Sequence, residues 1–259
     1  MHTSLHKRLF KYHHKRWKHI RASLKDFLKK GADEDLHELR VEIKQLTSLY
    51  HFIESCDLNF NGNKLLKPIE KIFKLSGKVR DYRNAKQFCN KYKIEQKAFR
   101  NEAKKQEDYL EQLQQKHKRH TLDFKKLENK TNHELRGIGK EQIKNYLRVK
   151  RQEAITDLGK KSNDKALHEV RKKIKELCYI ANISSFERKG ICNAQDLKKL
   201  DKLQDDIGNW HDISKFSQKL QGFFKAKQSR LPQAIAREEQ RLLKEIRKNS
   251  AEFIQAQSK

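Results

Sequence analysis

Two short segments of the sequence place a histidine, an arginine and a lysine on one face of a predicted helix. In the first segment, His37, Arg40 and Lys44 are separated by three and four residues. Because an α-helix has about 3.6 residues per turn, this spacing gathers the three side chains into one narrow basic stripe. Like charges at such spacing repel each other, and a phosphate group would replace the repulsion with charge-assisted hydrogen bonds.

The same pattern returns 131 residues later, where His168, Arg171 and Lys175 form the stripe and Lys172 lies beside it. Leucine and isoleucine occupy the neighbouring face of both segments, which predicts helices with one side in a core. A basic stripe is usually only a solvated surface. Its recurrence in both halves of the chain favours an anion-binding site instead.

One offset of 131 residues also carries Gly77 onto Gly208. Several motifs in a single register indicate a duplicated unit. We therefore expect one four-helix repeat at 1–131 and another at 132–259, with the break near the polar stretch 128–133.

Composition and periodicity predict an all-α fold. The 259 residues include only nine glycines and two prolines, and alternating strand patterns are absent from the sequence. The expected architecture is two four-helix bundle-like repeats related by pseudo-twofold symmetry. Asp33 and Asn163 are expected to cap the second helix of each repeat, and Pro232 to kink or split the last helix. The predicted helices are 3–30, 34–55, 63–77, 80–127, 134–161, 164–186, 193–208 and 210–256.

The junctions after the third helix of each repeat offer a second anion site. Gly77 and Gly208 are predicted to end those helices, so that the next helix presents free N–H groups. Arg80 and His211 occupy equivalent positions three residues after the glycines. Further basic residues complete the predicted site: Lys78, Arg83 and Lys202.

Arg16 lies on the apolar face of the first predicted helix, where a cation needs a partner. Lys144 and Arg151 have the same placement in the second half. An ion pair with Asp81 or Asp212 and a contact with the ligand are both open for Arg16, which is included among the candidate site residues.

The charge balance identifies the class of partner. Lysine and arginine number 61 against 34 acidic residues, which gives a formal net charge of +27. Such an excess favours a polyanion, with nucleic acid, an anionic membrane surface and polyphosphate as the alternatives. No apolar run approaches the ~18 residues that span a bilayer. The four cysteines have no zinc-binding spacing, and the lone dipeptide His211–Asp212 lacks the other ligands of a metal hydrolase, so we expect no metal, no cofactor and no enzyme activity.

The two Leu-His-Glu-(Leu/Val)-Arg motifs, at 36–44 and 167–175, and the segments 77–81 and 203–212 resemble the CHAD family, the conserved histidine α-helical domain. The resemblance covers nearly the whole chain. It implies a duplicated helical domain with a basic central surface that binds inorganic polyphosphate. The residues that the resemblance places on this surface are His37, Arg40, Lys44, His168, Arg171 and Lys175, with Arg80 and His211 nearby.

The expected function is electrostatic capture of polyphosphate in a channel formed by both repeats, with an affinity that falls as salt rises. The alternative is an RNA- or single-stranded-DNA-binding module, and weak nucleic-acid binding is expected in either case. Trp17, Trp210 and most tyrosines lie at apolar helical positions, which leaves few platforms for stacked bases. The expected location is the cytoplasm. Association with polyphosphate granules, the chain length bound and the oligomeric state are open.

Overall fold

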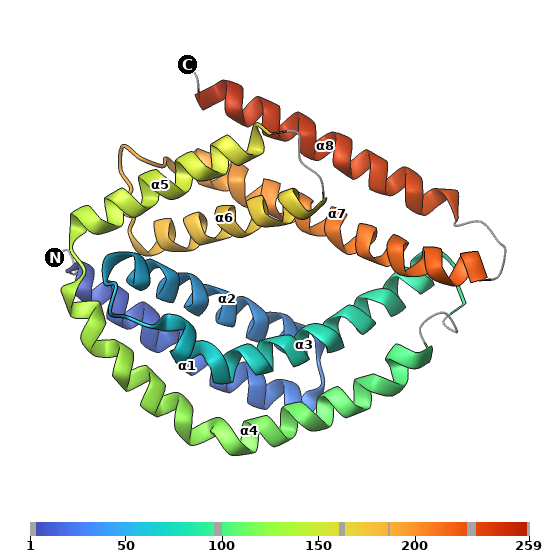
Figure 1. Cartoon of the computed structure of the whole chain (residues 1–259), viewed down its shortest axis with the longest axis horizontal. Helices are drawn as coiled ribbons and strands as arrows, with labels where there is room; N and C mark the ends of the chain where they lie inside the picture. The colour runs from blue at the N-terminus through green and yellow to red at the C-terminus, as the bar shows by residue number, and fades with distance from the viewer. Residues whose placement is uncertain (1–3, 96–99, 161–163, 186, 227–231, 258–259) are drawn as a thin grey trace. The chain divides into compact units, whose positions relative to one another are not determined.

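Helices joined by short connections make up the residues that the computed structural model of the protein describes, which are 4–95, 100–160, 164–185, 187–226 and 232–257 (Figure 1). Within these ranges the regular structure consists of α-helices and one short 3-10 helix, η2 (Leu135–Gly137). None of the described helices contains an apolar stretch long enough to cross a membrane. The α-helices are α1 (Leu5–Lys30), α2 (Asp33–Cys56), α3 (Gly62–Lys91), α4 (Arg100–Glu134), α5 (Lys140–Leu158), α6 (Asp164–Ile183), α7 (Ala194–Ala226) and α8 (Gln233–Gln257).

Local signals explain both ends of α1 and the start of α7. The Ser4 side chain accepts a hydrogen bond from a backbone N–H at the start of α1, and Gly31 closes that helix with a left-handed φ of 69°. The predicted cap at Asp33 is wrong, because Ala32 occupies the cap position of α2 and Asp33 is the first helical residue. Asn193 caps α7 by accepting the backbone N–H of Asp196 at 2.7 Å. The predicted cap at position 163 lies outside the described residues.

The helix ends predicted at Gly77 and Gly208 are wrong. Both glycines lie inside continuous helices, α3 and α7, so neither position presents the free N–H groups of a helix start. The breaks fall later, after residues 91 and 226. Pro232 directly precedes α8, which confirms that the last predicted helix is divided there.

The start of α5 also differs from the prediction, since α5 begins at residue 140 and not at 134. The polar stretch expected to separate the repeats is helical, because α4 continues through it to Glu134. The boundary at 131 and the duplication itself therefore stay predictions that rest on the sequence motifs.

The helices form two compact units, each assembled from separate stretches of the chain. Unit 1 contains Met1–Arg83, Asn101–Tyr146 and Tyr179–Glu187. Unit 2 contains Asn84–Arg100, Leu147–Cys178 and Arg188–Lys259. Unit 1 thus depends on a short segment that the chain supplies long after the rest of that unit.

In unit 1, α1 packs along α2 around a core of aromatic side chains. The largest fully buried members are Trp17, Phe27, Tyr50, Phe52 and Phe124. In unit 2, α7 packs along α8, and Trp210 is 1% exposed in this core. The burial of both tryptophans confirms that they are core residues and not surfaces for stacking.

Three arginines of α1 each pair with a buried glutamate from another part of unit 1. Arg16 pairs with Glu42 of α2 at 2.9 Å, and Arg21 pairs with Glu128 of α4 at 2.9 Å. Arg8 donates to both oxygens of Glu187, at 2.5 and 2.6 Å. Each glutamate is 5% exposed. Removal of one partner from such a pair leaves a buried charge and costs about 3–5 kcal/mol, so α1 is strongly tied to its neighbours.

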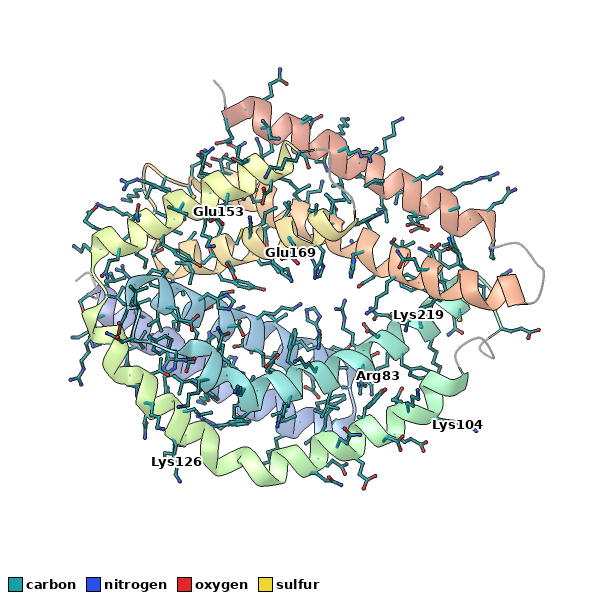
Figure 2. All side chains as sticks on the ribbon, viewed as in Figure 1. Arg83, Lys104, Lys126, Glu153, Glu169 and Lys219 are labelled. Carbon is teal, nitrogen blue, oxygen red and sulfur yellow. The ribbon has the colours of Figure 1, made fainter. Side chains whose placement is uncertain are left out.

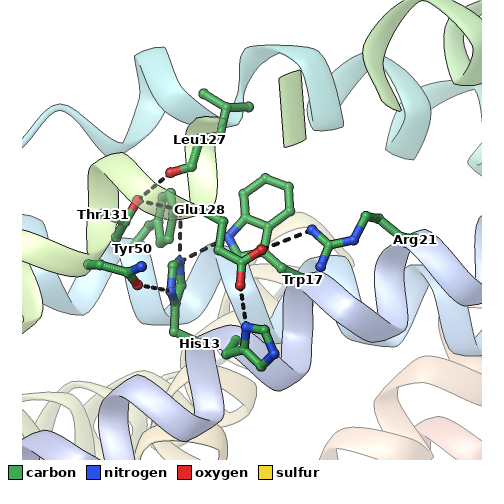
Figure 3. Close-up of polar contacts among 9 residues, drawn as sticks. His13, Trp17, Arg21, Tyr50, Leu127, Glu128 and Thr131 are labelled. Carbon is green, nitrogen blue, oxygen red and sulfur yellow. Dashed lines mark hydrogen bonds and ion pairs between the residues drawn. The ribbon is translucent and has the colours of Figure 1, made fainter. Parts of the chain in front are cut away.

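A buried histidine lies beside these ion pairs (Figure 3). His13 Nε2 accepts a hydrogen bond from Trp17 Nε1 at 2.9 Å, while its Nδ1 lies 3.2 Å from Asn132 Oδ1 and donates to it. The Tyr50 hydroxyl lies 3.2 Å from the same Nε2. Burial lowers the pKa of His13 to about 4, although the negative charge of Glu128 acts to raise this pKa. The imidazole is therefore neutral in the folded protein at neutral pH.

This burial predicts an acid-sensitive stability. Below the ordinary histidine pKa of about 6.5, the unfolded chain takes up a proton that folded His13 resists, so stability is lost as pH falls from 6.5 toward 4. We expect His13 to account for about 2 kcal/mol of lost unfolding free energy between pH 7 and pH 5. Urea unfolding at the two pH values measures this loss. A His13→Leu variant should show a correspondingly smaller pH dependence, and an unchanged pH dependence would contradict the assignment.

Candidate functional site

In unit 2, the guanidinium of Arg171 lies against the backbone of α7. Arg171 Nε donates to the backbone carbonyl of Gln204 at 2.9 Å. A Cβ atom added at Gly208 would lie 2.7 Å from Arg171 Cζ, which is closer than carbon atoms pack. We call this group, with His168, Lys175 and His211, the Arg171 cluster. The absence of a side chain at Gly208 gives the arginine access to the carbonyl one helical turn earlier.

Unit 1 contains a matching arrangement between α2 and α3. Arg40 Nη1 donates to the backbone carbonyl of Phe73 at 2.7 Å and to Ser76 Oγ at 3.1 Å. The guanidinium lies over the Phe73 ring, with Cζ 4.1 Å from its centroid, and Lys44 Nζ lies 5.9 Å from the same centroid. We call these residues, with His37, the Arg40 cluster. A Cβ added at Gly77 would lie 2.9 Å from Arg40 Nη1.

These contacts explain why the sequence prediction of the helix ends failed. Glycine in a helix interior costs about 1 kcal/mol relative to alanine and is commonly taken as a boundary. Here Gly77 and Gly208 remain helical because an arginine of the preceding helix fills the space beside them. The same guanidinium-to-carbonyl bond offsets part of that cost.

Two histidines of the Arg171 cluster lie side by side. The ring centroids of His168 and His211 are 4.7 Å apart and the ring planes differ by 30°. Burial lowers the pKa of His168, and the neighbouring His211, Lys172 and Arg171 lower it further. His168 Nδ1 is buried and has no hydrogen-bond partner among the described residues. The pair therefore holds a largely neutral imidazole within a basic group of side chains.

Most other predicted site residues lie on the same four helices. Arg80 is half-buried on α3 and Lys175 half-buried on α6, while Lys202 is exposed on α7 and His37 exposed on α2. Lys172 is exposed and pairs with Glu169 at 2.8 Å.

Two predicted residues are directed to other partners. Lys78 Nζ lies 4.6 Å from the ring centroid of Tyr109 of α4. Arg83 pairs with Asp33, and its Cζ lies 5.3 Å from the Phe27 ring centroid. Both cations contribute charge to unit 1, through side chains that contact Tyr109, Asp33 and Phe27.

The partner expected for Arg16 was wrong. Arg16 pairs with Glu42, and it also donates to Gln45, so neither Asp81 nor Asp212 neutralises it. Arg16 is 7% exposed, and its guanidinium covers the Tyr12 ring, with Cζ 4.7 Å from the ring centroid. Because buried partners hold this side chain, we leave Arg16 out of the binding site proposed below.

The corresponding cations of the second half also have local partners. Lys144 pairs with Glu141 at 2.6 Å, and Arg151 donates to Gln257. Asp81 and Asp212 lie inside α3 and α7. Asp212 accepts a hydrogen bond from Asn84 at 3.3 Å.

Sequence reasoning missed the groups that hold the two arginines. Phe73, Ser76 and Gln204 orient the guanidinium groups, yet none of them has a residue type that suggests anion binding. The usable signal was the glycine that follows each arginine by 37 residues inside a helix-forming stretch. An isolated glycine in such a pattern often marks a close approach by another group.

The arrangement suits an anion with oxygen acceptors. Arginine presents a planar fork of N–H donors that matches phosphate geometry, and a fixed orientation lowers the entropy lost on binding. Lysine adds a mobile charge beside it, and histidine adds a donor whose charge depends on pH. Both clusters combine these three residue types.

The glycine–arginine contact can be tested by a double-mutant cycle. Gly208→Ala must displace the Arg171 guanidinium. The protein then loses the hydrogen bond from Arg171 to the Gln204 carbonyl, and this loss offsets the stability gained from the higher helix propensity of alanine. In an Arg171→Ala background the same change meets no guanidinium and should stabilise the protein by up to about 1 kcal/mol. We expect a coupling energy of about 1–2 kcal/mol from urea unfolding.

Gly159→Ala provides the matched control, since a Cβ there would make only ordinary contacts, the nearest at 3.5 Å. Its effect should add to that of Arg171→Ala. If the effects of Gly208→Ala and Arg171→Ala on the free energy of unfolding are additive, the close approach of Arg171 to Gly208 does not govern the packing of α6 against α7.

Comparison with known proteins gives a consistent family assignment. The family model described as "CHAD domain" matches residues 11–221. A crystal structure of the CHAD domain from the plant Ricinus communis is similar over 96% of this chain and 92% of that chain, with a TM-score of 0.66 and 14% sequence identity. At this identity the likeness concerns the fold alone. No curated protein sequence matches the chain significantly. Because the family model covers most of the sequence, the chain belongs to the CHAD family.

Proposed function

We propose that this protein binds inorganic polyphosphate through the Arg40 cluster and the Arg171 cluster. The observation that carries the proposal is the anchored arginine of each cluster. Each guanidinium is held by a backbone carbonyl of the following helix, at 2.7 Å for Arg40 and 2.9 Å for Arg171, with lysine and histidine on the same helix. An orienting contact of this kind prepares a planar cation for a phosphate group.

Family membership and charge support the same ligand. CHAD domains are associated with polyphosphate binding in general. The formal charge of +27 gives this chain a strong long-range attraction for any polyanion. Exposed lysines such as Lys104 and Lys126 of α4 add to that field (Figure 2).

A bare phosphate chain fits these clusters better than a nucleic acid does. Single-stranded nucleic acids are commonly held by aromatic rings on which the bases stack. Trp17 and Trp210 are buried in the cores, and Phe73 is covered by Arg40. The clusters offer charge and donors rather than stacking surfaces, so polyphosphate should compete well against RNA of equal phosphate content.

We propose that the protein binds polyphosphate without reacting with it. We also propose that one polyphosphate chain contacts both clusters. A chain that reaches the second cluster binds it intramolecularly, so long chains should bind more tightly than tripolyphosphate. A cytoplasmic location, with association at polyphosphate granules, belongs to the same proposal.

Calorimetric titration with long-chain polyphosphate tests the proposed site. We expect Arg171→Ala and Arg40→Ala each to weaken binding at least about tenfold, because a charge-assisted hydrogen bond contributes about 1.5–3 kcal/mol. Arg171→Lys should weaken binding less than Arg171→Ala, because it keeps the charge and loses the fork. The affinity of the natural protein should fall steeply with added salt.

Lys248→Ala is the control for charge alone, since Lys248 is an exposed cation of α8 that pairs with Glu252 at 3.8 Å. Circular dichroism verifies that each variant is folded. If Lys248→Ala and Arg171→Ala lower the affinity for polyphosphate equally, binding depends on the net charge of the protein and not on the Arg171 cluster. Tighter binding of an RNA oligomer than of polyphosphate would assign the clusters to nucleic acid.

Binding should also depend on pH through His168. Its lowered pKa leaves this imidazole mostly neutral in the free protein, while a bound polyanion favours the imidazolium and raises the pKa. Binding then takes up protons, so affinity increases as pH falls from about 7.5 to 5.5, by at most about tenfold per pH unit for each proton.

Titration in buffers of different ionisation enthalpy counts the protons taken up. His168→Gln should still bind polyphosphate but with less proton uptake. Proton uptake that is the same in the variant would place the titrating group elsewhere.

A further inference from the structure

Three side chains on α1 and α2 form a second constellation in unit 1, distinct from the arginine clusters. His19 lies on α1, while Glu38 and Glu42 lie one turn apart on α2. One potential ligand atom from each residue lies within 4.8 Å of the other two. The two ligand types, imidazole and carboxylate, are ones that divalent transition metals accept together.

The distances are those of ligands around an ion rather than of hydrogen-bonded partners. His19 Nδ1 lies 3.6 Å from Glu38 Oε1 and 3.5 Å from Glu42 Oε1. Hydrogen bonds between such atoms measure about 2.7–3.2 Å. In a tetrahedral zinc site with bonds of about 2.0–2.1 Å, neighbouring ligand atoms lie about 3.3–3.4 Å apart. A small movement of the side chains would therefore bring all three atoms to bonding distance of one ion.

The burial of Glu42 provides an independent argument. Glu42 is 5% exposed, and Arg16 is its ion-pair partner. Its Oε1 accepts from Arg16 at 2.9 Å, but its Oε2 is buried without a hydrogen-bond partner among the described residues. A buried carboxylate oxygen left unsatisfied is unfavourable, and a cation bound by both oxygens of the Glu42 carboxylate would remove the cost.

The surroundings favour one class of ion. Arg16 would hold the metal-bound carboxylate from behind, as hydrogen-bonding partners of metal ligands commonly do. Glu38 and His19 are partly exposed, with 53% and 35% of their side chains accessible, so an ion can enter from solvent. The imidazole disfavours Mg²⁺ and Ca²⁺, which prefer oxygen ligands in larger sets.

We propose that His19, Glu38 and Glu42 bind a divalent transition-metal ion of the zinc class, with solvent as the remaining ligand, and that the ion joins α1 to α2. The site is independent of the proposed polyphosphate function. It would act as a structural clamp, because its ligands come from two helices whose packing forms the core of unit 1.

Titration of the tag-free protein with ZnCl₂ in a phosphate-free buffer tests the site. We expect one binding event that His19→Gln and Glu38→Gln each weaken by at least about tenfold. Zinc at about 100 times its dissociation constant should raise the melting temperature of the natural protein by about 5 °C, and the rise should be lost in both variants. Co²⁺ in place of zinc should give the visible absorption bands of a tetrahedral complex.

Glu34→Gln is the matched control, because Glu34 is an exposed acid in the first turn of the same helix. This variant should bind zinc as the natural protein does. Glu42 itself is not the first choice, since its loss also leaves Arg16 buried without its ion-pair partner. Equal zinc binding by the natural protein and by both ligand variants would overturn the proposal and assign the ion to surface histidines.

Discussion

The contact between an arginine and a helix-interior glycine controls how the candidate site is built. A helical carbonyl retains a second lone pair after its helical bond, but the side chain one turn later normally covers it. At Gly77 and Gly208 there is no such side chain, so Arg40 and Arg171 reach the carbonyls of Phe73 and Gln204. The orientation of each cation and the close approach of its two helices both follow from the missing side chain at each glycine.

A chain with this excess of positive charge must also hold its cations inside a compact fold. Unit 1 does so by giving the arginines of α1 their own buried acids, Glu42, Glu128 and Glu187. Each pair is expensive to desolvate, so its net contribution to stability is small, whereas its geometry is demanding. We infer that these pairs determine how α1 is rotated and how closely it packs in unit 1, and that they add little to the free energy of unfolding. The cations of the two clusters lie on other helices.

Periodicity was sufficient to predict the helical class and the course of α1, α2 and α6, because their apolar faces repeat every 3.6 residues and end in ordinary signals such as Gly31. It was insufficient at Gly77 and Gly208, where a tertiary contact overrides the local preference of glycine to end a helix. The residue types of the basic stripes were readable from sequence, whereas the carbonyls that orient them were not. The group of His19, Glu38 and Glu42 was equally hidden, since 19 positions or more separate its histidine from its carboxylates and only the packing of α1 on α2 brings them together.

The composition of unit 1 has a consequence for how the protein is made. Its last segment, Tyr179–Glu187, follows a long stretch that belongs to unit 2, and Glu187 is the partner of Arg8. During translation, therefore, α1 emerges from the ribosome with an arginine whose acidic partner has not yet been synthesised. A fragment cut at the middle of the chain would lack that acid permanently. The two halves of the sequence are for this reason unsuited to separate expression. Unit 1 can be completed only late in the synthesis of the chain, after Glu187 has been added.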